Sequence, residues 1–291
     1  MRKSKTPTDR SGGGIAIART IAETASTLAT HSSDPVGACG IGFCGPVDFR
    51  QQKSVKSLHV GGWENISLAR QLSEALGVPA IMDNNGNVGA LGEAMLGAAR
   101  GKENVVYMTL STGVAGGILI NGKVYRGSRN IAAELGHVKV VSNDETPFRC
   151  YCGRRGCLES VCSVGGIRAI TERRMKAPLS PRELFEAANQ GDMQAADVIE
   201  EITGYLARGI ASVAHTLDPD VIVIGGGVAR AGDVLFEPLY LALKSELMSA
   251  YDPRTLVVPA ALGDDSVLIG AVALARTLEP APTSSTHPVS R

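Results

Sequence analysis

The sequence predicts an α/β fold, because strand-like apolar runs alternate with helical patterns along most of its 291 residues. VVYMTLSTGVAGGILINGKVYRG has the pattern of two strands with a glycine loop between them, followed by a third strand. Asn121-Gly122 lies between alternating apolar residues, which is a strong signal for a two-residue hairpin turn. In DPDVIVIGGGVA a short apolar run ends at three glycines, as a buried strand does before a turn.

Apolar residues at helical spacing predict helices at 15–28, 66–76 and 88–99, and a mostly helical region over 181–217. Gly77 follows the second helix at the position of a C-terminal glycine cap. Further strands are expected in GACGIGFCGPVD, VPAIMD and TLVVPA, and a last helix covers the GAVALA stretch. Residues 11–14 carry three glycines after a serine and are expected to form a loop.

This pattern divides the chain into a smaller domain at 1–108 and a larger domain at 109–265, with a helix at 266–278 that can return to the smaller domain. Residues 279–291 are rich in Pro, Ser and Thr, so we expect a disordered tail.

The composition is that of a soluble globular protein, with zero formal net charge and 44% hydrophobic residues. A neutral chain lacks the basic surface typical of nucleic-acid binding, and no apolar run has the length of a membrane span. The polar first residues lead into no signal-peptide core, and the clustered cysteines favour the reducing cytoplasm.

One histidine and three cysteines have spacings that suit a tetrahedral zinc ion. His137 lies thirteen residues before Cys150, and Cys152 and Cys157 follow closely. Zn²⁺ prefers four thiolate and imidazole ligands in structural sites. We expect residues 138–141 to form a strand that brings the histidine to the cysteines. The alternative is three buried cysteines and an unrelated histidine, but closely spaced Cys and His residues favour a metal.

The segment 134–159 resembles the signature of the ROK family, named for repressors, open reading frames and sugar kinases. In that family a Glu-x-Gly-His precedes a Cys-x-Cys-Gly-x-x-Gly-Cys-Leu-Glu loop. The chain has ELGH at 134–137 and CYCGRRGCLE at 150–159. The resemblance runs from about Gly40 to the stretch that begins at Gly270. It implies an actin-like (ribonuclease H-like) two-domain sugar-kinase fold, with sugar and ATP in the cleft between the domains.

The resemblance implies that Asn84, Glu134, His137 and Glu159 contact the hydroxyl groups of a hexose. Carboxylates, amides and imidazoles suit hydroxyls, which donate and accept hydrogen bonds at once. In the family the motif histidine also binds zinc through one ring nitrogen, so the zinc would be structural. The alternative for the two glutamates is the usual one of solvated surface carboxylates.

Two glycine-rich stretches are candidates for ATP binding with Mg²⁺. Ser111, Thr112 and Gly113, with Gly116 and Gly117 beyond, resemble the family's second phosphate loop. Backbone N–H groups in such loops can reach phosphate oxygens. A second set resembles the adenosine-side motif: Gly225, Gly226 and Gly227. The alternative for both is a tight turn, and neither fits the Walker A or Rossmann fingerprint.

One departure from the family pattern concerns the catalytic base. The family has an aspartate in an Asn-Asp-Ala-Asn stretch ahead of Ala-Leu-Gly-Glu, and alignment on ALGE puts Asn85 at that position. A carboxamide cannot accept the proton of the sugar hydroxyl, and loss of a general base typically costs about a hundred- to ten-thousand-fold in rate. Asp83 is a poor substitute, because phosphoryl transfer depends on accurate positioning.

A second departure lies at the start of the chain. Family kinases open with a strand, an Asp-x-Gly-Gly-Thr turn and two further strands, and nothing here matches them. We therefore expect an incomplete N-terminal domain with exposed strand edges.

Two functions stay open on the sequence. The first is ATP-dependent phosphorylation of a hexose, either glucose or an N-acylhexosamine. The second is a non-catalytic sugar-binding homologue, a pseudokinase, which Asn85 favours. A zinc-stabilised structural protein that binds no ligand is a third hypothesis. Repressors of the family carry a winged helix before the fold, which is not expected here, whereas the resemblance suggests a homodimer.

Overall fold

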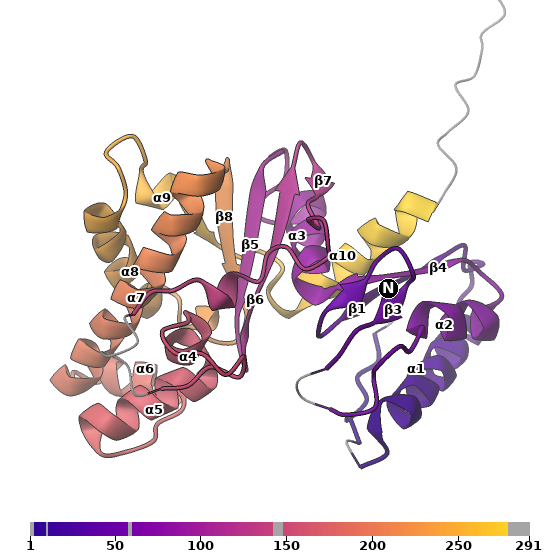
Figure 1. The fold of residues 1–291 in the computed structure, drawn as a ribbon, viewed down its shortest axis with the longest axis horizontal. Coiled ribbons are helices and arrows are strands. Elements are labelled where there is room, and N and C mark those ends of the chain that lie inside the picture. Colours follow the sequence, from indigo (N-terminus) through magenta and orange to yellow (C-terminus); the bar gives the residue numbers. More distant parts are fainter. Residues whose placement is uncertain (1–2, 10, 58–59, 142–147, 279–291) are drawn as a thin grey trace, which may run out of the picture.

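The computed structural model describes residues 3–9, 11–57, 60–141 and 148–278, and a mixed sheet lies at its centre (Figure 1). The strand order is β7-β6-β5-β8-β9. The bounds are β5 Val105–Leu110, β6 Val114–Ile120, β7 Lys123–Val124, β8 Val221–Gly225 and β9 Val257–Pro259. β6 is antiparallel to both β5 and β7, whereas β5, β8 and β9 are parallel. The predicted hairpin joins β6 to β7, with positive φ at Asn121 and Gly122.

Both faces of this sheet are buried, as β5 shows. Its Met108 and Leu110 belong to the largest hydrophobic cluster, whereas Val105 and Tyr107 belong to a separate cluster. Successive side chains of a strand point to opposite faces, so each cluster covers one face. Helices α4 Glu159–Cys162, α5 Val164–Met175, α6 Pro181–Asn189, α7 Met193–Leu217, α8 Asp233–Glu246 and α9 Pro253–Leu256 contribute to the first cluster. Helix α3 Asn85–Leu96 covers the other face.

A smaller lobe lies on the far side of α3 (Figure 1). We use this name for β1 Cys39–Phe43, β2 Val47–Asp48, β3 Lys53–Ser54, β4 Ala80–Asn84, α1 Gly13–Thr30 and α2 Leu68–Leu76. β1 and β4 form a parallel pair, and β2 and β3 form a hairpin. The core of the lobe includes Phe43, Leu72 and the single tryptophan, Trp63, whose ring stands edge-on to Phe43 at a centroid distance of 5.0 Å. Residues 3–9 form no strand.

Helix α10 Ser266–Ala275 lies near the end of the described chain and packs against both α3 and β1. It thereby joins the smaller lobe to the helix that covers the central sheet. Glycines make this close packing possible. A methyl group on Gly270 would lie 1.7 Å from the carbonyl oxygen of Val88, and one on Gly40 would lie 1.8 Å from that of Ala271. The remaining short helices are η1 Leu135–His137, η2 Ala229–Ala231, η3 Gly263–Asp265 and η4 Arg276–Leu278.

The structure confirms the α/β class and corrects two local predictions. Residues 11–14 are not all loop: α1 begins at Gly13, and the N–H group of Gly14 donates to the carbonyl oxygen of Gly61 at 3.0 Å. Residues 138–141 form no strand, since Lys139 makes only an isolated bridge with Cys157.

The predicted tail at 279–291 lies outside the described residues, and the domain limits stay a prediction. No helix in the described part of the chain combines the length and the apolar character of a membrane span.

Replacement of Gly270 by alanine should lower the free energy of unfolding by about 1–3 kcal/mol, because the new methyl group must push α10 away from α3. Urea unfolding measures the change. Gly204→Ala is the matched control: Gly204 lies within α7 with open space around it, so alanine there should stabilise by about 0.5–1 kcal/mol. Equal stability of the two variants would contradict the packing described for α10.

Candidate functional site

Strand β6 carries two adjacent glycines, and two segments pack directly on their backbone. A methyl group on Gly116 would lie 2.7 Å from the carbonyl oxygen of Ala133 and 2.6 Å from the side chain of Leu135. One on Gly117 would lie 2.2 Å from the carbonyl oxygen of Gly86. Real Cβ atoms do not approach other atoms so closely, so these positions accept only glycine without movement. The start of α3 and the segment before η1 therefore meet at β6.

The first residue of β6 holds the carboxylate of Glu159. The Val114 N–H group donates to Glu159 Oε2 at 3.0 Å, and the Cys150 thiol lies 3.3 Å from Oε1. Glu159 begins α4 and is 9% exposed, so it is not a solvated surface glutamate. A side chain at Gly113 would lie 2.7 Å from this carboxylate, which explains the glycine in the β5–β6 turn.

His137 faces two different groups with its two ring nitrogens. Nδ1 lies 3.5 Å from the sulfur of Cys150, whereas Nε2 lies 3.8 Å from Glu134 Oε2. Burial raises the pKa of Glu134, the nearby His137 lowers it, and the charge of Glu159 raises it further. The two carboxylates therefore lie near the imidazole, with Glu159 buried and the Glu134 side chain 45% exposed.

The four residues predicted to bind metal lie together. One ligand atom from each of His137, Cys150, Cys152 and Cys157 falls within 4.8 Å of all the others. The Cys152 and Cys157 sulfurs are 3.8 Å apart. Zinc bonds of about 2.3 Å to sulfur and about 2.0 Å to nitrogen place tetrahedral ligands about 3.8 Å apart for S···S and about 3.5 Å for S···N. The Cys152–Cys157 separation of 3.8 Å and the His137–Cys150 separation of 3.5 Å match these values.

The backbone of the cysteine loop accounts for this clustering. Gly153 and Gly156 have φ angles of 82° and 74°, in the left-handed region that glycine adopts at low cost. The Cys150 N–H group donates to the carbonyl oxygen of Arg154 at 2.8 Å and closes the loop. Burial raises the pKa of the Cys150 and Cys157 thiols, so a bound metal must displace their protons.

The start of α3 holds the predicted base position and one predicted sugar contact. Asn84 caps the helix: its Oδ1 accepts from the Gly86 N–H group at 2.8 Å, and its Nδ2 donates to the carbonyl oxygen of Gly45 at 2.9 Å. Asn85 is the first helical residue. Asp83 is buried and ion-paired with Arg126 at 2.7 Å, so its carboxylate is not free to act as a base.

The two predicted nucleotide stretches lie at the same edge of the sheet. Ser111 follows β5 and Gly226 follows β8, and these two strands are parallel neighbours. Carboxyl ends of parallel strands form the usual ligand-binding edge of α/β sheets. A side chain on Gly226 would lie 2.3 Å from the carbonyl oxygen of Leu110, whereas one on Gly227 would meet nothing within 4 Å. The N–H group of Val164, at the start of α5, donates to the carbonyl oxygen of Ser111 at 2.9 Å.

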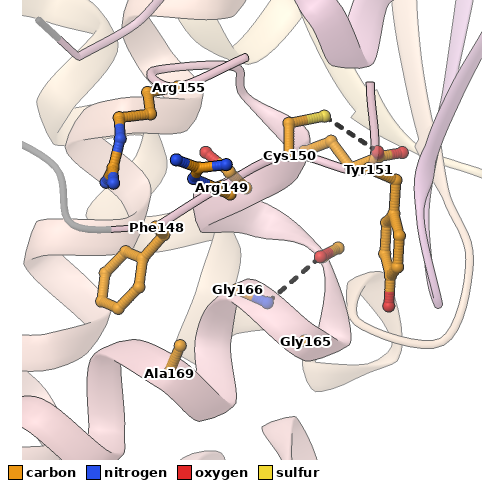
Figure 2. Close-up of a pocket in the computed structure, with 11 residues that line it drawn as sticks. Phe148, Arg149, Cys150, Tyr151, Arg155, Gly165, Gly166 and Ala169 are labelled. Atoms are coloured by element: carbon orange, nitrogen blue, oxygen red, sulfur yellow. Dashed lines mark hydrogen bonds between the residues drawn. The ribbon is translucent and has the colours of Figure 1, made fainter. Parts of the chain in front are cut away.

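A cavity of about 490 Å³ opens beside Glu159 (Figure 2). Figure 2 shows Arg149 and Arg155 on one side of it and Gly166 of α5 on the other, with Tyr151 at one end. Asn84, Glu134 and His137 are not part of its lining. The cavity therefore includes only one of the four predicted sugar contacts.

Comparisons with known proteins define the family. The family model described as "ROK family" matches residues 2–278. A glucokinase of Halalkalibacterium halodurans is 34% identical over 285 residues, which cover 92% of this chain and 86% of the relative. A xylose repressor of Bacillus subtilis is 26% identical over 236 residues, which cover 81% of this chain and 60% of the repressor.

Solved structures agree with this result. The ROK hexokinase of Thermus thermophilus has a TM-score of 0.82 and 33% identity, covering 94% of this chain and 89% of its own. A ROK family glucokinase of Streptomyces griseus, solved in complex with glucose and AMPPNP, has a TM-score of 0.79 and 29% identity, covering 92% and 90%. The chain belongs to the ROK family. It has the actin-like fold of the family's sugar kinases, and the resemblance inferred from the sequence is confirmed.

The sequence placed Gly116 and Gly117 beyond the phosphate loop, whereas in the structure they lie within β6 under Ala133, Leu135 and Gly86. Two further contacts have no counterpart among the sequence predictions: the Val114 N–H group holds Glu159, and Arg126 pairs with Asp83. The glycine pair inside an apolar strand was the available signal, since glycine in a strand often marks a close backbone approach. The pairing of Arg126 carries no local sequence signal.

Replacement of Glu159 by alanine should lower the free energy of unfolding by about 1–3 kcal/mol, because the buried Val114 N–H group loses its acceptor. Glu159→Gln retains an acceptor oxygen and should cost less. Urea unfolding measures the free energy of unfolding of both variants. Glu74→Ala is the control, because Glu74 belongs to an exposed ion pair. A loss for Glu159→Ala no larger than for Glu74→Ala would contradict the buried role of Glu159.

Proposed function

We propose that this chain binds a hexose or N-acylhexosamine together with Mg-ATP and transfers the γ-phosphate to a sugar hydroxyl at a reduced rate. The orientation of His137 carries the proposal: Nδ1 faces the cysteines while Nε2 faces Glu134. One side of the ring is thereby available to a metal and the other to a ligand between the two glutamates. The glucose complex of the Streptomyces griseus relative supports a sugar as that ligand.

The residues divide into a sugar set and a nucleotide set. The sugar set comprises Asn84, Asn85, Glu134, His137 and Glu159. Carboxylate oxygens would accept from sugar hydroxyls, and the Asn84 and Asn85 amides and His137 Nε2 would complete the set. The nucleotide set comprises Ser111, Thr112, Gly113, Gly225, Gly226 and Gly227. Mg²⁺ would bridge the phosphate oxygens and offset their charge during transfer.

Zinc would hold the sugar set in shape and take no part in the reaction. Three cysteines and one histidine satisfy a closed four-coordinate site, which leaves no open position for a substrate. Lys139 lies 3.4 Å from the Cys157 sulfur and would offset the negative charge of three thiolates around one divalent ion. The cytoplasmic location and the homodimer stay predictions.

The reduced rate follows from Asn85. A sugar oxygen that attacks the γ-phosphate must lose its proton, and an amide at the base position cannot take it. Binding of the sugar does not require the proton to move. A non-catalytic sugar-binding protein is therefore the second candidate. The engagement of Asp83 with Arg126 favours it, because the Asp83 carboxylate is then not free to replace the base.

Two measurements on the zinc-loaded protein test these functions together. ADP release is followed with Mg-ATP and glucose, mannose, N-acetylglucosamine or N-acetylmannosamine, and calorimetry measures binding of the same sugars. Sugar-dependent ADP release above the ATPase background supports the kinase. Sugar binding without turnover selects the non-catalytic candidate. A folded, zinc-loaded sample that binds none of these sugars contradicts both.

Replacement of Cys152 by serine should abolish stoichiometric zinc binding and weaken sugar binding, since a three-ligand site no longer holds the loop that carries Glu159. Elemental analysis and calorimetry measure the two effects. Cys44→Ser is the control, because Cys44 is exposed and lies outside the cluster. Unchanged sugar affinity in metal-free protein would show that zinc does not shape the site.

Replacement of Asn85 by aspartate should raise the rate of sugar-dependent ADP release, by up to about a hundred- to ten-thousand-fold if a general base is fully restored. Initial rates at saturating ATP and sugar measure the gain. Asn84→Asp places a carboxylate one residue earlier in the chain and should give no comparable gain. If both variants behave alike, Asn85 is not at the base position.

A further inference from the structure

The ion pair between Arg126 and Asp83 crosses from the large sheet to the smaller lobe. Arg126 follows β7, and Asp83 belongs to β4. Arg126 Nε and Nη2 lie 2.8 Å and 2.7 Å from Asp83 Oδ2. The Asp83 side chain is only 3% exposed and that of Arg126 is 22% exposed. A charge pair so far removed from water needs both partners, since either charge alone would be left uncompensated.

A third segment supports the pair. The guanidinium carbon of Arg126 lies 3.5 Å from the centre of the Phe49 ring, in the turn between β2 and β3. Gln52, in the same turn, accepts from the Met82 N–H group at 2.6 Å and donates to the carbonyl oxygen of Phe49 at 2.7 Å. The turn is thereby fixed to β4, and Arg126 stacks on a ring that belongs to the smaller lobe.

Each partner lies next to one half of the proposed sugar site. Asp83 Oδ1 accepts from the Asn84 N–H group at 2.7 Å and from the side chain of Asn87 at 3.0 Å. The carbonyl oxygen of Arg126 accepts from the N–H group of Ala132 at 3.1 Å, so the loop after β7 returns to Arg126 two residues before Glu134. The pair therefore joins the backbone that carries Asn84 to the backbone that carries Glu134.

We propose that Arg126 is a positioning residue: its ion pair with Asp83 sets the separation between Asn84–Asn85 and Glu134–His137 and so determines sugar affinity. The inference rests on the proposed function, because it assigns both groups to one sugar. It also accounts for the acidic residue that lies two positions before Asn85. The Asp83 carboxylate orients the start of α3 and does not accept a proton from the substrate.

The geometry of the pair makes the inference specific to arginine. A planar guanidinium can contact a carboxylate through two nitrogens while its face stacks on an aromatic ring. A lysine at position 126 would retain the charge but would lose the second contact and the stacking on Phe49. Arg126→Lys therefore weakens the positioning without leaving Asp83 buried and unpaired.

The test compares Arg126→Lys and the charge-free double variant Asp83→Asn/Arg126→Gln with the wild-type protein. Arg254→Ala is the matched control, because Arg254 also binds a carboxylate through two nitrogens, on Glu237, and stacks 4.7 Å from the Tyr240 ring, but in an exposed position. The readouts are sugar affinity, Mg-ATP affinity, zinc content, and amide hydrogen exchange without sugar over 80–87 and 125–137.

We expect both site variants to bind sugar at least tenfold more weakly, with zinc content and Mg-ATP affinity unchanged. Amide exchange should become faster in both segments, and Arg254→Ala should match the wild type in every readout. A general loss of structure would reduce Mg-ATP affinity and zinc content as well, which separates it from lost positioning.

Sugar affinity within twofold of the wild type in folded, zinc-loaded Arg126→Lys and double variants would overturn the inference and leave the proposed function standing. If the wild-type protein binds none of the sugars, the proposed function fails, and hydrogen exchange then decides the role of the ion pair by itself. Equal exchange over 80–87 and 125–137 in the wild-type and variant proteins would show that Arg126 does not position these segments.

Discussion

The site depends on the absence of side chains at two positions of β6. Gly116 and Gly117 let the segment before η1 and the start of α3 approach the backbone of the strand. Each segment carries residues assigned to the sugar, and Val114 at the start of the same strand holds Glu159. The segment before η1, the start of α3 and Glu159 thus all contact one strand of the central sheet. A shift of the β6 backbone would therefore move all three.

The cysteine cluster imposes the second constraint. A metal bound by these four ligand atoms, which lie within 4.8 Å of one another, would fix the position of His137 relative to the loop that leads into α4 and Glu159. Because Nδ1 faces the cysteines, the direction of Nε2 follows. A metal at this cluster would therefore act on the proposed sugar site through geometry alone, as expected of an ion that is closed off from substrate.

The features that the sequence could predict are local ones. Cys150, Cys152 and Cys157 lie within one loop, so their spacing alone indicates that they bind the same metal ion. The hairpin at Asn121 follows from two residues, and strand–helix alternation gives the class. The valine-rich segment 138–141 is not a strand, although its sequence predicts one. Its N–H groups find acceptors on the cysteine loop: Val140 donates to the carbonyl oxygen of Gly156 at 2.9 Å.

Features that depend on distant parts of the chain could not be predicted. Asp83 and Arg126 are separated by 43 residues, and neither lies in a pattern that suggests a partner. The sequence makes Asp83 a poor substitute for the base because of its position, whereas the structure adds a second reason, its ion pair with Arg126. The start of α1 is a similar case. Three consecutive glycines suggest a loop, but a helix begins at Gly13, and the Gly61 carbonyl oxygen accepts from the Gly14 N–H group.

The central claim is that three segments around β6 form one sugar site. A crystal structure of the zinc-loaded protein with the sugar that binds best tests it most directly. The account predicts a pyranose whose hydroxyls contact Asn84 or Asn85, Glu134, His137 Nε2 and Glu159, with zinc on the opposite side of the His137 ring. A sugar held elsewhere, for example only in the cavity between Arg149 and α5, would contradict it.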